Sequence, residues 1–181
     1  MGERELAPGE WAVLALLSEQ PAHGWALASQ LGPEGELGSV WSLGRPLVYR
    51  SIEILAERGL IEPSGHEPGL RGPNRTIYRT TCEGATSLLG WVSEPVEHVR
   101  DVRSLLLLKL IFAERIGLDP TRMLHRQHEL IAEGLDALDE RAQSSTGAER
   151  ILLLFRVEST RAVLRFVDGL LESSPRLEAV G

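Results

Sequence analysis

The chain has 181 residues and a formal net charge of −7, with 43% hydrophobic and 25% charged residues. This is the composition of a globular protein with enough apolar residues for a core, and it excludes a largely disordered chain. The N-terminus lacks an apolar h-region, and no run approaches the ~18 apolar residues that span a bilayer, so we expect a soluble, cytoplasmic protein without a membrane partner.

Three helices are predicted in the first sixty residues. The first begins at Pro8, a favoured first-turn residue, and continues through "WAVLALLSEQ", whose apolar residues follow helical spacing. The segment "HGWALASQLG" predicts a short second helix that ends at Gly32. A third helix is expected from Arg45 to Gly59, because Pro46 suits its first turn and the glycine suits its C-terminal cap. Its core face has i, i+4 and i+7 spacing: Val48, Ile52 and Leu55.

Two short strands are predicted after the third helix. "LIEP" and "TIYRTT" are β-branched and apolar, and the Gly- and Pro-rich segment "SGHEPGLRGPNR" between them predicts a hairpin loop. Three helices followed by a hairpin predict a winged helix-turn-helix, so the expected fold class is mainly α with a two-stranded β wing. Thr80 and Glu83 have capping-box spacing, which predicts a fourth helix that runs as far as Pro95.

The second half of the chain predicts longer helices over 102–116, 120–142 and 148–171. We place a winged helix-turn-helix DNA-binding domain at 7–95 and a helical dimerisation domain at 100–173. The last helix has apolar faces too wide for a small module to bury alone, which favours a homodimer. The alternative is that the helices cover one another within one chain. The predicted dimerisation residues form one stripe: Leu153, Val157, Leu164, Val167 and Leu171.

Positive charge is concentrated in one window of an otherwise acidic first domain. The segment from Met1 to Pro95 holds 7 Arg and 12 Glu, a net charge of −5, whereas Arg45 to Arg79 holds 6 Arg and 4 Glu, a net charge of +2. Cationic side chains bind DNA phosphates and base edges, so this window is the expected contact surface. Alternatively, the arginines are surface residues paired with neighbouring glutamates. The predicted DNA-binding residues are Arg45, Tyr49, Arg50, Arg71, Arg75 and Arg79.

Three segments in this order, "HGWALASQLG", "VYRSIEILAERGLIE" and "GPNRTIYRTTCEGATSLLGWV", resemble the PadR family of bacterial transcriptional regulators. Farther on, "RDVRSLLLLKLIF" resembles the start of the helical C-terminal domain in the longer PadR subfamily. Trp25 stands where the family often has Tyr, and Cys82 where it often has Pro. The matching positions are His23, Gly24, Tyr49, Arg50, Leu55, Gly59, Leu60, Ile61, Tyr78, Arg79, Thr81 and Gly84.

The resemblance implies a homodimeric repressor that binds a palindromic double-stranded DNA operator. It also implies that the repressor releases the operator when it senses a small, often aromatic, molecule or another stress signal. Two-fold symmetry would place the two recognition helices about one DNA turn, ~34 Å, apart. The tryptophans Trp11, Trp41 and Trp91 are the candidate effector-binding residues; alternatively, they are core residues.

Catalytic and metal-site motifs are missing from the sequence. It has no phosphate-binding glycine loop, nucleophile elbow or paired carboxylates, so we expect no enzyme activity and no cofactor. Cys82 is the only cysteine, which excludes an internal disulfide and a cysteine-based zinc cluster, and we expect no metal. The alternative function is a winged-helix protein interaction module without specific DNA binding, which the net charge of −7 favours. Salt dependence separates the two, because DNA binding releases counterions.

Overall fold

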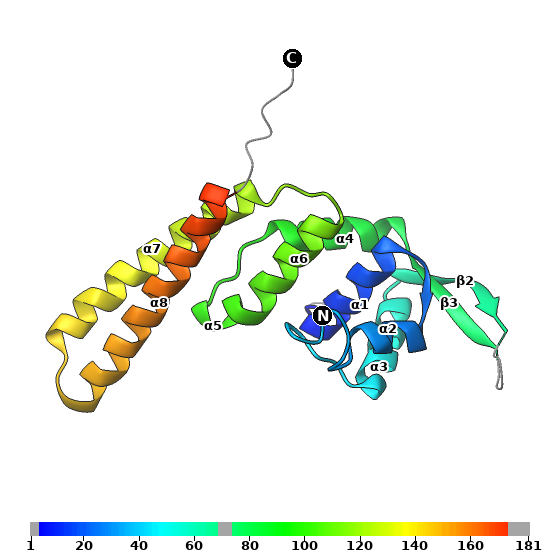
Figure 1. Cartoon of the computed structure of the whole chain (residues 1–181), viewed down its shortest axis with the longest axis horizontal. Helices are drawn as coiled ribbons and strands as arrows, with labels where there is room; N and C mark the ends of the chain where they lie inside the picture. Colours follow the sequence, from blue (N-terminus) through cyan, green and yellow to red (C-terminus); the bar gives the residue numbers. More distant parts are fainter. Residues whose placement is uncertain (1–3, 69–73, 174–181) are drawn as a thin grey trace, which may run out of the picture. The chain divides into compact units, whose positions relative to one another are not determined.

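The computed structural model describes residues 4–68 and 74–173 (Figure 1). Within these ranges the chain forms two compact units: the first contains the described residues up to Val92 together with 107–118, and the second contains residues 93–106 and 119–173. The segment 107–118 falls in the range predicted for dimerisation, but it packs with the first unit. None of the described helices has the length and hydrophobicity of a membrane span.

The first unit has the element order of a winged helix-turn-helix, and the predicted fold class is confirmed. Three helices precede a β-hairpin, and a helix follows it. A further helix returns from later in the chain. In chain order the elements are α1 (Pro8–Glu19), β1 (Ala22–His23), α2 (Gly24–Gln30), α3 (Arg45–Glu57), β2 (Ile61–Glu67), β3 (Arg75–Thr80), α4 (Cys82–Ser93) and α6 (Leu107–Arg115).

The sheet has three strands in the order β1-β3-β2, one more than predicted. Strand β1 has two residues, Ala22 and His23, which pair with Tyr78 and Ile77 of β3. Two residues are too few for an alternating pattern, so this strand leaves no local signal in the sequence. The strand β2 also continues to Glu67, well into the segment predicted as a loop, with an irregularity in register between Pro63 and Gly65.

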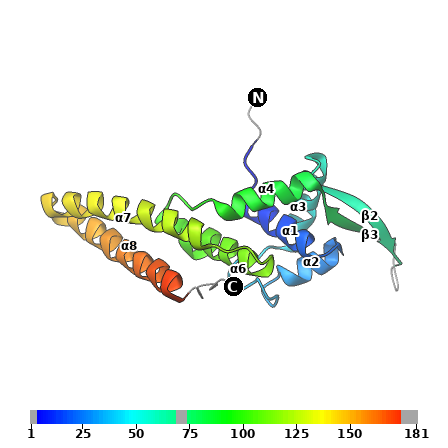
Figure 2. The same cartoon turned by 90° about the horizontal axis from the view of Figure 1, so that it is seen from above.

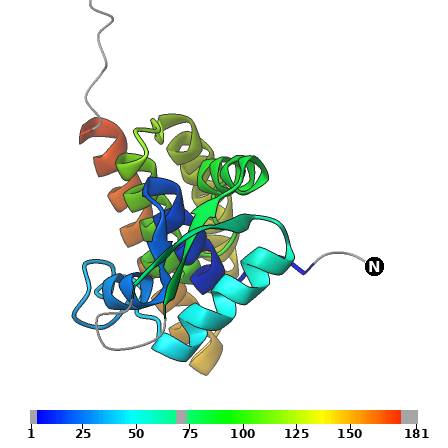
Figure 3. The ribbon, with the colours of Figure 1, turned by 90° about the vertical axis from the view of Figure 1, so that its right-hand side faces the viewer.

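The helix α1 forms the centre of the first hydrophobic core (Figures 2 and 3). All residues from Ala12 to Leu17 are at most 2% exposed. The buried face of α3 packs in the same core, as do Leu108 and Phe112 of α6. Burying a Leu or Phe side chain contributes about 1.5–3 kcal/mol to the free energy of folding. The stability of this core therefore depends on α6 as well as on the hairpin and the first three helices.

The cap of α4 differs from the predicted one. Thr80 and Glu83 were expected to form a capping box, but the Thr81 hydroxyl accepts the hydrogen bond from the Gly84 amide at 3.1 Å and donates to the Gly59 carbonyl at 2.7 Å. The prediction was one residue too early because β3 extends through Thr80. A Cβ atom on Gly84 would lie 2.0 Å from the Leu60 carbonyl oxygen, so this position requires glycine.

The second unit is built around a helical hairpin. It contains α5 (Val99–Asp101), a π-helix (Val102–Leu106), α7 (Thr121–Ser144) and α8 (Gly147–Ser173), so the helix predicted at 102–116 begins in π geometry. In the hairpin, Leu153 and Val157 of α8 pack with Ala142 of α7. The buried Gln127 side chain accepts from the Val96 amide at 2.7 Å and donates to its carbonyl at 3.0 Å. The segment before α5 is thereby fixed to α7.

Candidate nucleic-acid interface

The helix α3 lies at the surface of the first unit, with one face in the core and the other in solvent (Figure 3). Its N-cap is Gly44, and Pro46 occupies the first turn, where its missing amide hydrogen costs no helical hydrogen bond. Val48, Ile52 and Leu55 are buried as predicted. Apart from Ser51, which is also buried, the remaining residues of the first two turns are therefore available to a partner outside the chain.

Two of the predicted DNA-binding arginines lie on the exposed part of α3. Arg45 and Arg50 are both solvent-exposed. Within residues 4–68 and 74–173, neither guanidinium has a hydrogen-bond or ion-pair partner. A guanidinium keeps its charge at all physiological pH values and presents five donors, so both side chains can bind a phosphate or a base edge.

Tyr49 is held against the start of α2. Its side chain is 42% exposed, and a Cβ atom on Gly24 would lie 2.7 Å from its Cε1 atom. Glycine at this position therefore lets the tyrosine ring pack against α2. This contact joins two motif segments that are far apart in the sequence, because Gly24 belongs to the first and Tyr49 to the second.

The wing arginines have different environments. Arg75 is exposed, and its guanidinium carbon lies 5.4 Å from the centroid of the Trp25 ring, a cation–π distance. Arg79 pairs with Glu62 across the hairpin at 2.7 Å, so its charge is already matched in the free protein. Arg71 lies outside the described residues. Of the wing arginines that the structure describes, Arg75 is thus the better candidate for a phosphate contact.

His23 connects α2 to the wing, and sequence reasoning did not assign it a role. Its Nδ1 accepts a hydrogen bond from the Ala26 amide at 3.0 Å, which caps α2. The ring therefore carries its proton on Nε2, which lies 3.1 Å from the Glu67 carboxylate and 3.4 Å from a guanidinium nitrogen of Arg75. The signal in the sequence was the position of His23 directly before a short predicted helix, where a capping residue is expected. The contact with the wing depends on strand pairing, which is not local in the sequence.

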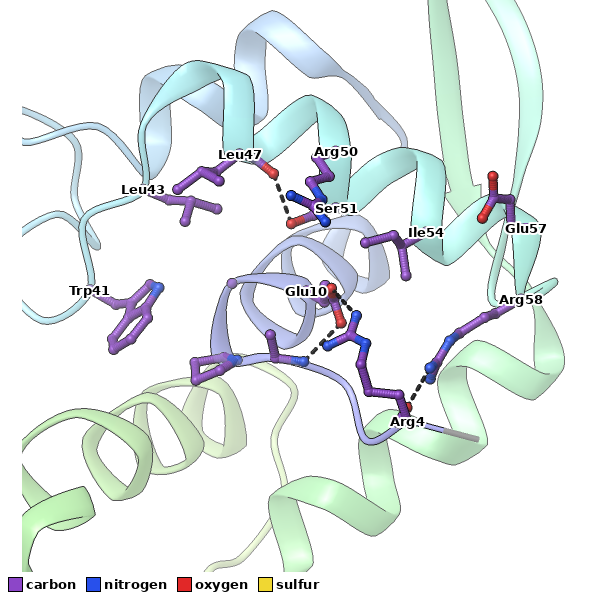
Figure 4. Close-up of a pocket in the computed structure, with 13 residues that line it drawn as sticks. Arg4, Glu10, Trp41, Leu43, Leu47, Arg50, Ser51, Ile54, Glu57 and Arg58 are labelled. Carbon is purple, nitrogen blue, oxygen red and sulfur yellow. Dashed lines mark hydrogen bonds and ion pairs between the residues drawn. The ribbon is translucent and has the colours of Figure 1, made fainter. Parts of the chain in front are cut away.

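A cleft of about 660 Å³ lies between the N-terminal segment and α3 (Figure 4). Its walls come from Arg4 and residues 7–10, from Trp41 and Leu43, and from one face of α3 that begins at Leu47 and continues to the C-cap residue Arg58. Glu10 is only 5% exposed, and its carboxylate accepts from Arg4 at 2.6 Å and from the Ala7 amide at 2.8 Å. The buried carboxylate at one wall of the cleft is therefore paired and hydrogen-bonded.

The three candidate effector tryptophans are in different surroundings. Trp11 and Trp91 stack on each other, with ring centroids 5.0 Å apart and an interplanar angle of 11°. Lys109 Nζ lies 5.0 Å from the centroid of the Trp91 ring. Trp41 lines the cleft, and neither of the other two does. Of the three tryptophans, Trp41 is thus the one that lines this cleft.

The stripe of α8 that was predicted for dimerisation faces largely inward. Leu153, Val157 and Val167 are buried, and Leu164 and Leu171 are half-buried. The face of α8 opposite this stripe carries exposed apolar residues, which we name the outer stripe. Its members are Ile151 (72% exposed), Leu152 (50%), Phe155 (71%) and Phe166 (38%).

Residues 13–89 match the model of the transcriptional regulator PadR-like family. Among proteins of curated function, none matches the chain. Similar solved structures include Bacillus subtilis PadR in complex with operator DNA, with 18% identity, 90% of this chain and 97% of that chain covered, and a TM-score of 0.46. Another is the same protein in complex with p-coumaric acid, with 18% identity, coverage of 92% and 98%, and a TM-score of 0.44. A third is the PadR-like regulator BC1756 from Bacillus cereus, with 20% identity, coverage of 91% and 96%, and a TM-score of 0.39. The part of the chain that carries α3 and the wing thus matches the PadR-like family of transcriptional regulators.

Proposed function

We propose that the protein is a cytoplasmic repressor that binds a palindromic operator as a homodimer and responds to a small-molecule effector. The observation that carries the DNA-binding part is the pair of exposed arginines on α3, Arg45 and Arg50, which have no partner within the described chain. Arg50 and Tyr49 supply contacts in the major groove, Arg75 and Arg71 bind the backbone from the wing, and Arg79 joins them when its pair with Glu62 opens.

The proposed dimer interface is the outer stripe of α8. The predicted stripe of Leu153 and Val157 packs within the chain, so it stabilises the hairpin on which the interface is built. Ile151 and Phe155 are one helical turn apart, and both are more than two-thirds exposed. Exposed contiguous apolar side chains mark interaction sites on soluble proteins. Two copies that meet along this stripe would each cover the other's exposed rings.

The test is fluorescence anisotropy with DNA from upstream of the protein's own gene, at several salt concentrations, with scrambled DNA as control. We expect sequence-selective binding whose affinity falls steeply with salt, with a slope of about −0.9 per phosphate contact. Binding to both DNAs with equal affinity, or a flat salt dependence, would favour the protein interaction module instead.

We expect His23→Asn to weaken DNA binding without destabilising the fold. Asparagine can still cap α2, but it is too short to reach Glu67, so the wing loses the contact between Glu67 and His23, while the pairing of β1 with β3 and the contact of Arg75 with Trp25 remain. His23→Ala removes both interactions and should also lower the free energy of unfolding by about 0.5–2 kcal/mol. Urea unfolding measures the change in stability, and the salt dependence of operator binding measures the change in DNA contacts. The slope of log K against log salt concentration should become smaller in magnitude by about 1 if Arg75 loses its phosphate contact. If the His23→Asn variant binds the operator as tightly as the wild-type protein does, His23 acts only as the cap of α2.

A further inference from the structure

The surface around the start of α3 is apolar as well as cationic. Among the residues of the first unit that the structure describes, four large apolar side chains are strongly exposed: Trp25, Leu47, Tyr49 and Leu89. Three of these four lie within the first five residues of α2 or α3, where Gly24 packs against Tyr49. Exposed apolar side chains that gather in one place mark a contact surface. The start of α3 therefore offers a partner apolar contacts beside its arginines.

Leu47 lies on the outward side of α3, next to Arg50. An α-helix turns by about 100° per residue, so Arg50 is about 200° around the helix from the buried Val48 and points away from the core. Leu47 is about 60° from Arg50 and one turn nearer the start of the helix, and its side chain is 51% exposed. A groove that receives the Arg50 guanidinium would therefore also meet the Leu47 side chain.

The backbone of Leu47 already has hydrogen-bond partners within the chain. Its amide donates to the Gly44 carbonyl at 2.9 Å, and its carbonyl accepts from the hydroxyl of the buried Ser51 at 2.9 Å (Figure 4). These bonds fix the position of the residue at the start of the helix. What Leu47 offers to a partner is therefore its side chain, which has no donor or acceptor and makes apolar contacts only.

The major groove of DNA presents one apolar group that differs between bases, the C5 methyl group of thymine. The N-terminal residues of a recognition helix are the ones that contact base edges. Against a leucine side chain, the amino group of cytosine or adenine would lose its water without gaining an acceptor, whereas the thymine methyl group gains from burial. The chemistry of Leu47 therefore matches thymine better than any other base.

We propose that Leu47 is a specificity-determining residue that reads a thymine methyl group in each half of the operator, beside the site bound by Arg50. This inference rests on the proposed DNA-binding function and adds a base preference to it. Loss of one buried methyl-sized group should weaken binding about fourfold when one half-site is changed, and about fifteenfold when both are.

The test is fluorescence anisotropy of the full chain with DNA from upstream of its own gene, in which each thymine is replaced in turn by deoxyuridine. Deoxyuridine keeps the hydrogen-bonding groups of thymine and lacks only the methyl group. We expect one thymine in each half-site at which the replacement raises the Kd of the wild-type protein. Leu47→Ala should bind the two DNAs equally at that position, and Leu47→Met should keep the preference for thymine.

Leu89→Ala is the matched control, because Leu89 is 47% exposed in the same unit but lies on α4. It should keep the full preference for thymine. The slope of log K against log salt concentration should be the same for Leu47→Ala and the wild-type protein, since the substitution changes no charge. Circular dichroism should show an unchanged fold for Leu47→Ala, because the side chain is half exposed.

Two outcomes would overturn the inference while DNA binding stands. One is selective binding by the wild-type protein with no thymine at which deoxyuridine raises the Kd. The other is a preference for thymine that Leu47→Ala retains in full at every such position. If the wild-type protein binds this DNA no more tightly than scrambled DNA, the proposed function itself fails, and the base preference fails with it.

Discussion

Alanine in place of Arg50 is expected to weaken operator binding by about 1–3 kcal/mol, which is roughly a 5- to 150-fold increase in Kd. The side chain is exposed on α3 and has no hydrogen-bond or ion-pair partner in the described chain, so the substitution removes a free cation and breaks no internal polar interaction. The dimer should persist, because the outer stripe lies on α8. Anisotropy with operator and scrambled DNA measures the affinity, and the loss should be larger for the operator.

Two further arginines provide the comparison for Arg50→Ala. Arg126→Ala, on an exposed position of α7, should change operator affinity at most about twofold, since Arg126 is outside the proposed contact surface and its charge is paired with Glu94. Arg79→Ala should have an intermediate effect, because DNA must first compete with the ion pair between Arg79 and Glu62. Operator binding by Arg50→Ala that equals that of Arg126→Ala would remove Arg50 from the proposed contact surface.

Aspartate in place of Phe155 is expected to convert the homodimer into monomers. Phe155 is 71% exposed in the single chain, so the substitution leaves the hairpin packing intact but would place a carboxylate in the apolar interface. Burying an unpaired charge is strongly unfavourable, and two-fold symmetry would introduce two such charges. Analytical ultracentrifugation over a range of concentrations should show a single species of monomer mass, with unchanged helical circular dichroism.

Arg156→Ala is the matched control for Phe155→Asp. It changes the next exposed residue of α8, about 100° around the helix from Phe155, and should leave the dimer unchanged. If Phe155→Asp remains a dimer, the interface lies elsewhere. If both variants dissociate, the effect does not come from the outer stripe.

The elements predicted correctly are those with strong local signals. Pro8 starts α1, and Gly59, with a φ of +69°, ends α3 in a left-handed conformation that favours glycine. The missed features depend on contacts between distant segments. The strand β1 exists only because its two residues lie beside β3, and the cap of α4 shifted to Thr81 because β3 ends later than expected.

The face that α8 directs outward was hard to predict because the helix is apolar on more than one side. Spacing alone identified a continuous stripe through Leu153 and Val157, but it could not show that α7 covers this stripe within the chain. Similarly, the arginines of the wing and α3 were evident from sequence. The pairing of Arg79 with Glu62 needed the strand register, and the cleft beside Arg50 needed the packing of the N-terminal segment.

The first unit is discontinuous in the sequence, which constrains how its gene can recombine. Leu108 and Phe112, from the segment 107–118, are fully buried in the core that also holds α1 and α3. A gene fusion that borrows only residues 1–95 would omit both side chains, and losing a large core residue typically costs about 2–5 kcal/mol, so the two losses together are comparable to the total stability of a small domain, about 5–15 kcal/mol. Residues 1–95 are therefore not expected to fold when they are moved alone into another protein. We expect that segments exchanged between relatives extend as far as Leu118.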